Sequence, residues 1–253
     1  MQKINILNIN ILKIKLEGLL ALIVDAVKSN QATVLLYGNI HTFNLAYKTP
    51  WLQDFLNQST VFCDGVGVQW GAKLLGEELP ERFTPPDWFP NLCELCVEHD
   101  FSLYLIGTKP GITEKVAQIY QEKYPKLKIV GTGHGYFNKD KNSAENQQVL
   151  DKINQANPDI LVIGFGMPVQ EKWLIDNLPD MNAKVYLTVG AMFDFLAGET
   201  QRGPKWMTDN GLEWLSRLFI EPKRLWKRYL IGNPLFFWRI LKQKLGFSKG
   251  SHV

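Results

Sequence analysis

Short apolar runs that end in glycine or a polar residue alternate with amphipathic segments along most of this chain, and this alternation is the strongest constraint on its fold. The apolar runs have strand length and are expected to form strands at residues 3–12, 33–37, 61–63, 102–106, 128–130, 160–163 and 185–189. Helical periodicity is found between them, at residues 16–28, 44–57, 68–75, 88–99, 112–124, 144–155 and 169–176. The pattern predicts an α/β fold with a mostly parallel, Rossmann-like sheet and helices on both faces.

The ends of the predicted strands carry the residues that are best suited to bind a ligand. They are Asn39, Asp64, Gly107, Gly164, Gly166 and Gly190. In open α/β sheets, ligands bind beyond the carboxyl ends of the strands, where backbone N–H groups can approach a phosphate or a sugar. Two interpretations of Asp64 are open. It caps the helix that begins near Val68, because Asp is a favoured N-cap, or it serves as a general base beside a crevice.

Other motifs indicate structure rather than chemistry. The glycines of residues 131–135 lack the GxGxxG spacing and are interpreted as a structural turn, which disfavours a nicotinamide cofactor. Cys93 and Cys96 have CxxC spacing without a second pair, so we interpret them as core residues rather than as a metal or redox site. The four histidines, His41, His99, His134 and His252, show no ligand spacing. We therefore predict no metal site and no cofactor.

The C-terminal segment differs in charge from the rest of the chain. From Trp214 onward, nine Lys and Arg residues and one acid give a net charge of +8, whereas residues 1–213, with 19 basic and 24 acidic residues, carry −5. Its basic residues alternate with aromatic ones, as in Phe236, Phe237, Trp238 and Arg239. Three interpretations are open, namely a helix in the interface of an anionic membrane, aromatic residues packed on the domain, and a nucleic-acid-binding surface. The interfacial helix is preferred because it accounts for the aromatic residues.

A series of motifs between residues 33 and 228 resembles one family of bacterial enzymes. After Asn39 they are DGVGV at 64–68, ERFTPPDW at 81–88, GYF at 135–137, PDILVIGFGMPVQEKW at 158–173, VGAMFDFLAG at 189–198, RGPKW at 202–206 and GLEWLSRLFIEPKR at 211–224. Together they resemble the TagA/WecG/CpsF family of glycosyltransferases, which add N-acetylmannosaminyl, N-acetylmannosaminuronyl or related sugars to an undecaprenyl-diphosphate-linked sugar.

The resemblance implies roles for particular residues. Asp64 matches the family's catalytic base, which deprotonates the acceptor hydroxyl for attack on the anomeric carbon of the donor with inversion. The substrate-binding residues that it implies are Asn39, Arg82, Gln170, Arg217, Arg224, Lys227 and Arg228. Tyr37 departs from the Thr that many members have at this position, and together with residues 84–86 it is expected to flank the substrates. Two interpretations of Arg202 are open, a surface turn and a phosphate clamp. Those in the C-terminal segment are expected to fold over the active site and to neutralise the diphosphate of the donor, a task for which Arg is suited.

The predicted function is an inverting, metal-independent transfer of a hexose, such as N-acetylmannosamine, from a UDP-sugar to a polyprenyl-diphosphate-linked sugar in cell-surface polysaccharide synthesis. Residues 1–213 are expected to form the catalytic domain, and residues 214–253 a basic aromatic appendage for membrane association and active-site closure. A deletion from Trp214 onward should leave a folded core with little activity. We expect a cytoplasmic protein, peripheral at the anionic inner face of the cell membrane, with no nucleic-acid partner; the resemblance also suggests a homo-oligomer.

Two other classes of function are open at this point. A soluble nucleotide-sugar oxidoreductase or epimerase would need the dinucleotide fingerprint that the sequence lacks. The second class is a non-catalytic protein that binds a membrane or nucleic acid through its basic segment. Such a function does not explain why Asn39, Asp64 and Gln170 are expected at one edge of the sheet.

Overall fold

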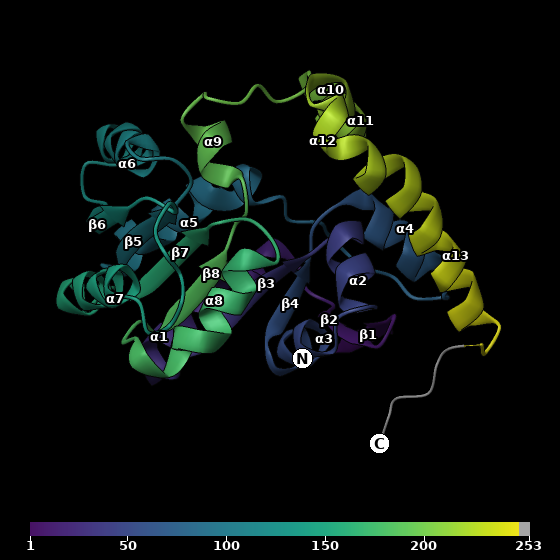
Figure 1. Ribbon diagram of the computed structural model, residues 1–253, viewed down its shortest axis with the longest axis horizontal. Helices are drawn as coiled ribbons and strands as arrows, with labels where there is room; N and C mark the ends of the chain where they lie inside the picture. The colour runs from purple at the N-terminus through teal and green to yellow at the C-terminus, as the bar shows by residue number, and fades with distance from the viewer. Residues whose placement is uncertain (248–253) are drawn as a thin grey trace. The chain divides into compact units, whose positions relative to one another are not determined.

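The computed structural model describes residues 1–247, apart from the side chains of Lys205 and Asp209, and shows an α/β fold built on one sheet (Figure 1). The strands are β1 (Lys3–Ile6), β2 (Ile9–Leu12), β3 (Thr33–Gly38), β4 (Thr60–Cys63), β5 (Ser102–Gly107), β6 (Lys128–Gly133), β7 (Ile160–Gly164) and β8 (Val185–Thr188). Their order is β1-β2-β4-β3-β8-β7-β5-β6. The β1–β2 hairpin is antiparallel, whereas the β2–β4, β3–β8, β8–β7, β7–β5 and β5–β6 pairings are parallel. The predicted fold class is confirmed.

The chain divides into two compact units. Unit 1 comprises Met1–Lys15, Tyr37–Thr84 and Gln201–Val253, and unit 2 comprises Leu16–Leu36 and Pro85–Thr200. The C-terminal segment thus belongs to the same unit as the first strands. The division of roles between residues 1–213 and 214–253 stays a prediction.

Unit 1 combines helices from the middle and the end of the chain. They are α2 (Ile40–Ala46), α3 (Pro50–Gln58), α4 (Val66–Leu74), α10 (Lys205–Asp209), α11 (Glu213–Ile220), α12 (Pro222–Trp226), a π-helical turn at Lys227–Ile231 and α13 (Gly232–Lys244). One helix was predicted over residues 44–57, but two helices meet at Thr49 and Pro50. Pro50 lacks a backbone N–H and is tolerated at the start of a helix rather than inside it, which explains the break.

The C-terminal helix α13 is part of the core of unit 1. Figure 1 shows α13 alongside α2 and α4, which it contacts. Phe236 and Ile240 are fully buried, and the ring centroid of Phe236 lies 5.9 Å from that of Phe43 on α2. Gly71 of α4 makes room for this ring, because a Cβ there would lie 2.8 Å from it. One face of α13 therefore packs on the protein, as the second interpretation of the tail had it.

Unit 2 contains the remaining helices, α1 (Leu16–Ser29), α5 (Pro85–His99), α6 (Ile112–Lys123), α7 (Ala144–Ala156), α8 (Val169–Asn177) and α9 (Met192–Leu196). Every residue of β7 and β8 is buried, as expected for parallel strands that are covered on both faces. Cys93 and Cys96 are buried on α5, consistent with a core role.

The prediction of a structural turn at residues 131–135 is wrong in part. Gly131 and Gly133 lie inside β6, and the ring of Tyr104 on β5 occupies the space beside Gly131, where a Cβ would come within 2.3 Å of it. The Tyr104 hydroxyl donates a hydrogen bond to the Thr132 carbonyl (3.2 Å). Glycine is needed here for the close approach of a neighbouring side chain, not for a turn.

Candidate active site

Asp64 directly follows β4 and lies in a polar cluster within unit 1. Its Oδ2 accepts a hydrogen bond from Nδ2 of Asn39 (3.1 Å), and its carboxylate also accepts one from the Thr84 side chain. The N-cap of α4 is Gly65, with φ of 103°, and this cap has no side-chain hydrogen bond. The capping interpretation of Asp64 is therefore wrong, and its carboxylate is held by Asn39 and Thr84 instead.

Asn39 is held in one orientation by the helix that it caps. Its Oδ1 accepts hydrogen bonds from the backbone N–H groups of His41 (3.0 Å) and Thr42 (3.2 Å), and its own N–H donates to the Thr42 hydroxyl (3.1 Å). This capping box fixes the amide oxygen on the start of α2, so the amide NH₂ group faces Asp64. The fold thus presents a fixed donor to one oxygen of the carboxylate.

The surroundings of Asp64 make it a stronger base than an ordinary aspartate. The pKa of Asp64 is raised to about 6, chiefly by burial and in part by the charge of Glu213, against the Asn39 and Thr84 hydrogen bonds and the charge of Arg228, which lower it. The residue nevertheless keeps part of its surface accessible. A partly open carboxylate with this pKa is ionised at neutral pH and is suited to accept a proton from a bound hydroxyl group.

Two cationic side chains are connected with this carboxylate, one through its charge and the other through Thr84. Arg228, in the π-helical turn, acts electrostatically on Asp64 and on His41, and burial together with Arg228 lowers the pKa of His41 to about 4. Arg82 donates to the Thr84 hydroxyl (3.2 Å) and to the Thr208 carbonyl (2.8 Å), and so connects α10 to the residue that holds Asp64.

The other predicted residues of unit 1 have different surroundings. Arg202 pairs with Glu213 (2.9 Å), and exposed Arg224 pairs with Glu221, the N-cap of its helix α12. Exposed Lys227 lies beside the ring of Trp226, Arg217 is half-buried on α11, and Tyr37 is buried in β3, where its carbonyl accepts a hydrogen bond from Thr42. The structure therefore places Asn39 in hydrogen-bond contact with Asp64, links Arg82 to Asp64 through Thr84, and places Arg228 near enough for its charge to lower the pKa of Asp64. Roles of the others in substrate binding stay predictions.

Gln170 belongs to unit 2 and is fully buried at the start of α8. Its Oε1 accepts hydrogen bonds from the N–H groups of Gly166 (3.2 Å) and Gly190 (3.2 Å), and its Nε2 donates to Glu171 (2.8 Å). It joins the loops that follow β7 and β8. A direct role in substrate binding stays a prediction.

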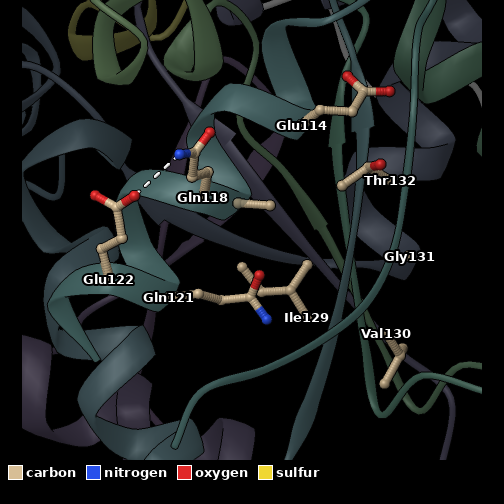
Figure 2. Close-up of a pocket in the computed structure, with 9 residues that line it drawn as sticks. Glu114, Gln118, Gln121, Glu122, Ile129, Val130, Gly131 and Thr132 are labelled. Carbon is tan, nitrogen blue, oxygen red and sulfur yellow. Dashed lines mark hydrogen bonds between the residues drawn. The ribbon is translucent and has the colours of Figure 1, made fainter. Parts of the chain in front are cut away.

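A cavity of about 580 Å³ lies in unit 2 between α6 and the edge strand β6 (Figure 2). The α6 side carries Glu114, Gln118, Gln121 and Glu122, and the β6 side is residues 129–132. The two glutamates would repel a phosphate group, and the predicted site residues lie elsewhere in the chain. We therefore do not assign the donor site to this cavity.

Two residues near this site, His41 and Glu213, were not assigned a role from the sequence, whereas Thr84 was expected to flank the substrates but not to hold Asp64. His41 and Thr84 follow Asn39 and Arg82 by two residues, and Glu213 lies in the GLEWLSRL motif. Nothing in these spacings separates them from other polar residues, because their surroundings depend on the fold. Within residues 1–247, no group of three His, Cys, Asp or Glu side chains is arranged to hold a metal ion.

The fold and the site define an α/β protein in which a carboxylate with a raised pKa follows a strand of the sheet and Arg228 acts on it electrostatically. The chain matches the model of the Glycosyl transferase WecG/TagA/CpsF family over residues 4–250, and it belongs to this family. It is a glycosyltransferase, and the oxidoreductase and non-catalytic alternatives are set aside.

Two curated relatives carry the same name, N-acetylglucosaminyldiphosphoundecaprenol N-acetyl-beta-D-mannosaminyltransferase. The protein of Bacillus subtilis (strain 168) is 30% identical over 192 residues, which cover 76% of this chain and 72% of the relative. The protein of Staphylococcus aureus (strain MRSA252) is 25% identical over 225 residues, which cover 87% of this chain and 85% of the relative.

Proposed function

We propose that this protein transfers N-acetylmannosamine or a closely related hexose from a UDP-sugar to a polyprenyl-diphosphate-linked sugar, with inversion and with Asp64 as the general base. The observation that carries the proposal is the Asp64 carboxylate, held by Asn39 and given a raised pKa. The names of the two relatives, which specify N-acetylmannosamine and an undecaprenol-diphosphate acceptor, support the choice of substrates.

In the proposed reaction, the Asp64 carboxylate takes the proton of the acceptor hydroxyl as its oxygen attacks the anomeric carbon. The bond from that carbon to the diphosphate oxygen breaks, and UDP leaves with the electron pair. Asn39 holds one oxygen of Asp64, and the base is thereby oriented before the substrate arrives. Arg228 stabilises the negative charge on the leaving diphosphate. A diphosphate near Arg228 also offsets the cationic charge that lowers the pKa of Asp64, so that donor binding strengthens the base.

The identity of the donor and the need for a metal are tested together by UDP release. We expect acceptor-dependent release from one member of a panel of UDP-sugars, with an N-acetylglucosaminyl-diphosphate-lipid as the acceptor. Release should survive EDTA, because we propose that arginine takes the role that a divalent cation has in other enzymes of this kind. Dependence on an added divalent ion would contradict the metal-independent part of the proposal and leave the reaction class intact.

The pH dependence of the reaction tests the assignment of the base. Asp64 must be unprotonated to accept a proton, so kcat/KM should rise with pH through about 6, the pKa of Asp64. An aspartate in ordinary surroundings titrates near pH 4, so the acidic limb of the kcat/KM profile would then lie near pH 4. The measurement is kcat/KM at subsaturating acceptor from pH 4.5 to 8, with protein stability verified at each pH.

We also propose that the protein lies on the cytoplasmic face of the membrane, with the C-terminal helix at the surface. From Pro222 to Lys244 the chain is one helical run, followed by its C-cap Leu245. The apolar outer stripe of this segment consists of Trp226, Leu230, Trp238, Leu241 and Leu245. These side chains are 41–70% exposed, and Lys223, Lys227, Lys242 and Lys244 are exposed on the same run. An apolar stripe flanked by lysines suits the interface of an anionic bilayer. No helix in the described part of the chain is long and apolar enough to span one. Self-association stays a prediction.

A further inference from the structure

The inner face of α13 is fixed by polar contacts as well as by packing. Its residues are Gly232, Phe236, Arg239, Ile240 and Gln243, whose spacing places them along one side of the helix. Gln243 accepts a hydrogen bond from the Leu7 N–H (2.8 Å) and donates one to the Asn5 carbonyl (3.0 Å), which holds the end of α13 to the β1–β2 hairpin. Arg239 is only 6% exposed, so it lies on the inner face although it belongs to the basic aromatic pattern that favoured an interfacial helix.

Arg239 and Asn44 join α13 to α2. Nη1 of Arg239 donates to Oδ1 of Asn44 (2.7 Å) and to the Asn44 carbonyl (3.3 Å), and the guanidinium lies 4.0 Å from the ring centroid of Tyr47. Nδ2 of Asn44 donates to the carbonyl of Gly232, the first residue of α13 (2.7 Å). We call Asn44, Gly232 and Arg239 the latch. Both ends of the Asn44 amide are therefore used to fix one helix.

The latch is better explained by orientation than by stability. Burial lowers the pKa of Arg239, which shows that its charge is in an unfavourable environment, and its contacts are an amide, a carbonyl and an aromatic ring. A well-packed apolar side chain often stabilises a fold as much as a buried charge does. Hydrogen bonds in fixed directions do what apolar packing does not, because they set the rotation of a helix and its position along its axis.

The latch connects two parts of the active site through a short helix. α2 has seven residues; its N-cap Asn39 holds Asp64, and Asn44, one turn further on, holds Gly232. Gly232 directly follows the π-helical turn that carries Arg228. π-Helical turns are rare and frequently mark functional sites. One short helix thus contacts both Asp64 and the residue that follows the turn carrying Arg228.

We propose that Asn44 and Arg239 are positioning residues, which lock α13 against α2 and thereby set Arg228 against Asp64 and His41. They touch no substrate. The kinetic part of this inference rests on the proposed function, whereas the electrostatic part concerns the protein alone.

The electrostatic part is tested by NMR titration of the full chain, with carboxyl ¹³C signals for Asp64 and imidazole signals for His41. Because the charge of Arg228 lowers the pKa of both groups, Arg228→Met should raise both. Arg239→Met should raise both pKa values in the same direction, and Arg228→Met/Arg239→Met should shift them no further than Arg228→Met. Lys28→Met, which removes an exposed cation from α1, is the matched control and should shift neither pKa.

Two results would overturn the inference. One is a folded Arg239→Met protein in which the pKa values of Asp64 and His41 are unchanged. The other is a double variant whose pKa shifts are larger than those of Arg228→Met alone. Thermal unfolding checks each variant. If Arg239→Met does not fold, Asn44→Ala removes the other partner and should give the same shifts; unfolding of both would assign the pair to stability and reject the inference.

The kinetic part is measured in parallel. Arg239→Met should lower kcat by about tenfold, as expected when a charged group is displaced without being removed, and should raise the pH of the acidic limb. If the wild-type protein transfers no sugar from any donor, the proposed function fails, and the titrations still decide the role of the latch.

Discussion

Replacement of Asp64 by asparagine is expected to lower the transfer rate by about a thousandfold, within the range of 10²–10⁴ that a positioned general base contributes. Asparagine has the shape of aspartate, and its side-chain oxygen can still accept the Asn39 hydrogen bond, but it cannot take the proton of the acceptor hydroxyl. The measurement is acceptor-dependent UDP release at pH 8. If the variant retains more than about a tenth of the wild-type rate and the acidic limb of its kcat/KM profile is unchanged, another residue is the base.

The same substitution should not weaken the fold. Because burial raises the pKa of Asp64 to about 6, the folded protein binds this proton more tightly than the unfolded chain, and ionisation of Asp64 costs stability as pH rises towards 6. The full loss of folding stability is present above about pH 6. It disappears below the pKa that Asp64 has in the unfolded chain. The Tm of Asp64→Asn should therefore equal or exceed that of wild type at pH 8. Asp54→Asn, on the exposed surface of α3, is the control and should change neither rate nor Tm.

The proximity of Asn39 and Asp64 could be predicted from local patterns. Each follows a short apolar strand, and parallel strands that end at one edge bring such residues together. The structure places Nδ2 of Asn39 3.1 Å from Oδ2 of Asp64. The capping box that orients Asn39 also has a local signal in the sequence, Thr42 three residues later.

The buried and exposed faces of the C-terminal helix could not be told apart from local patterns in the sequence. Arg239 and Lys242 look equivalent in a basic aromatic segment, yet Arg239 is buried and Lys242 is exposed. The difference depends on Asn44, which is 195 residues away in the chain. Gly131 presents the same difficulty. A glycine is needed there because the ring of Tyr104, on a neighbouring strand, occupies the space of a side chain. Local patterns predict elements and strand ends, whereas contacts distant in sequence decide which side chain faces inward.

The structure also changes the way in which the membrane hypothesis is tested. A deletion from Trp214 onward would remove Leu225, Tyr229, Phe236 and Ile240, all of which are buried. Such a truncation exposes core surface on α2 and α4, so a loss of activity would not distinguish unfolding from loss of membrane contact. Substitutions on the outer stripe avoid this problem because they leave the inner face intact.

Replacement of Trp238, Leu241 and Leu245 by serine should abolish binding to anionic vesicles and lower transfer to a long-chain acceptor in those vesicles by about a hundredfold. The three side chains are 41–70% exposed, so each is free to enter a bilayer interface, and a loss of about 1 kcal/mol for each would give this factor. Vesicle co-sedimentation measures binding. Transfer to a short-chain, water-soluble acceptor should keep most of its rate, because Phe236, Arg239 and Gln243 still hold α13 in place.

The matched control replaces two exposed apolar residues outside this helix, Trp51 and Ile119, by serine. It lowers surface hydrophobicity in the same way and should leave both binding and transfer unchanged. Equal losses with the long-chain and short-chain acceptors would mean that the stripe acts on the chemical step rather than on the membrane. Unchanged vesicle binding would show that the outer stripe does not bind the membrane. The stripe would then be a surface for another partner, such as a second copy of this chain. A loss confined to the vesicle assay would show that the two faces of one helix separate two tasks, since the inner face holds the active site and the outer face reaches the acceptor.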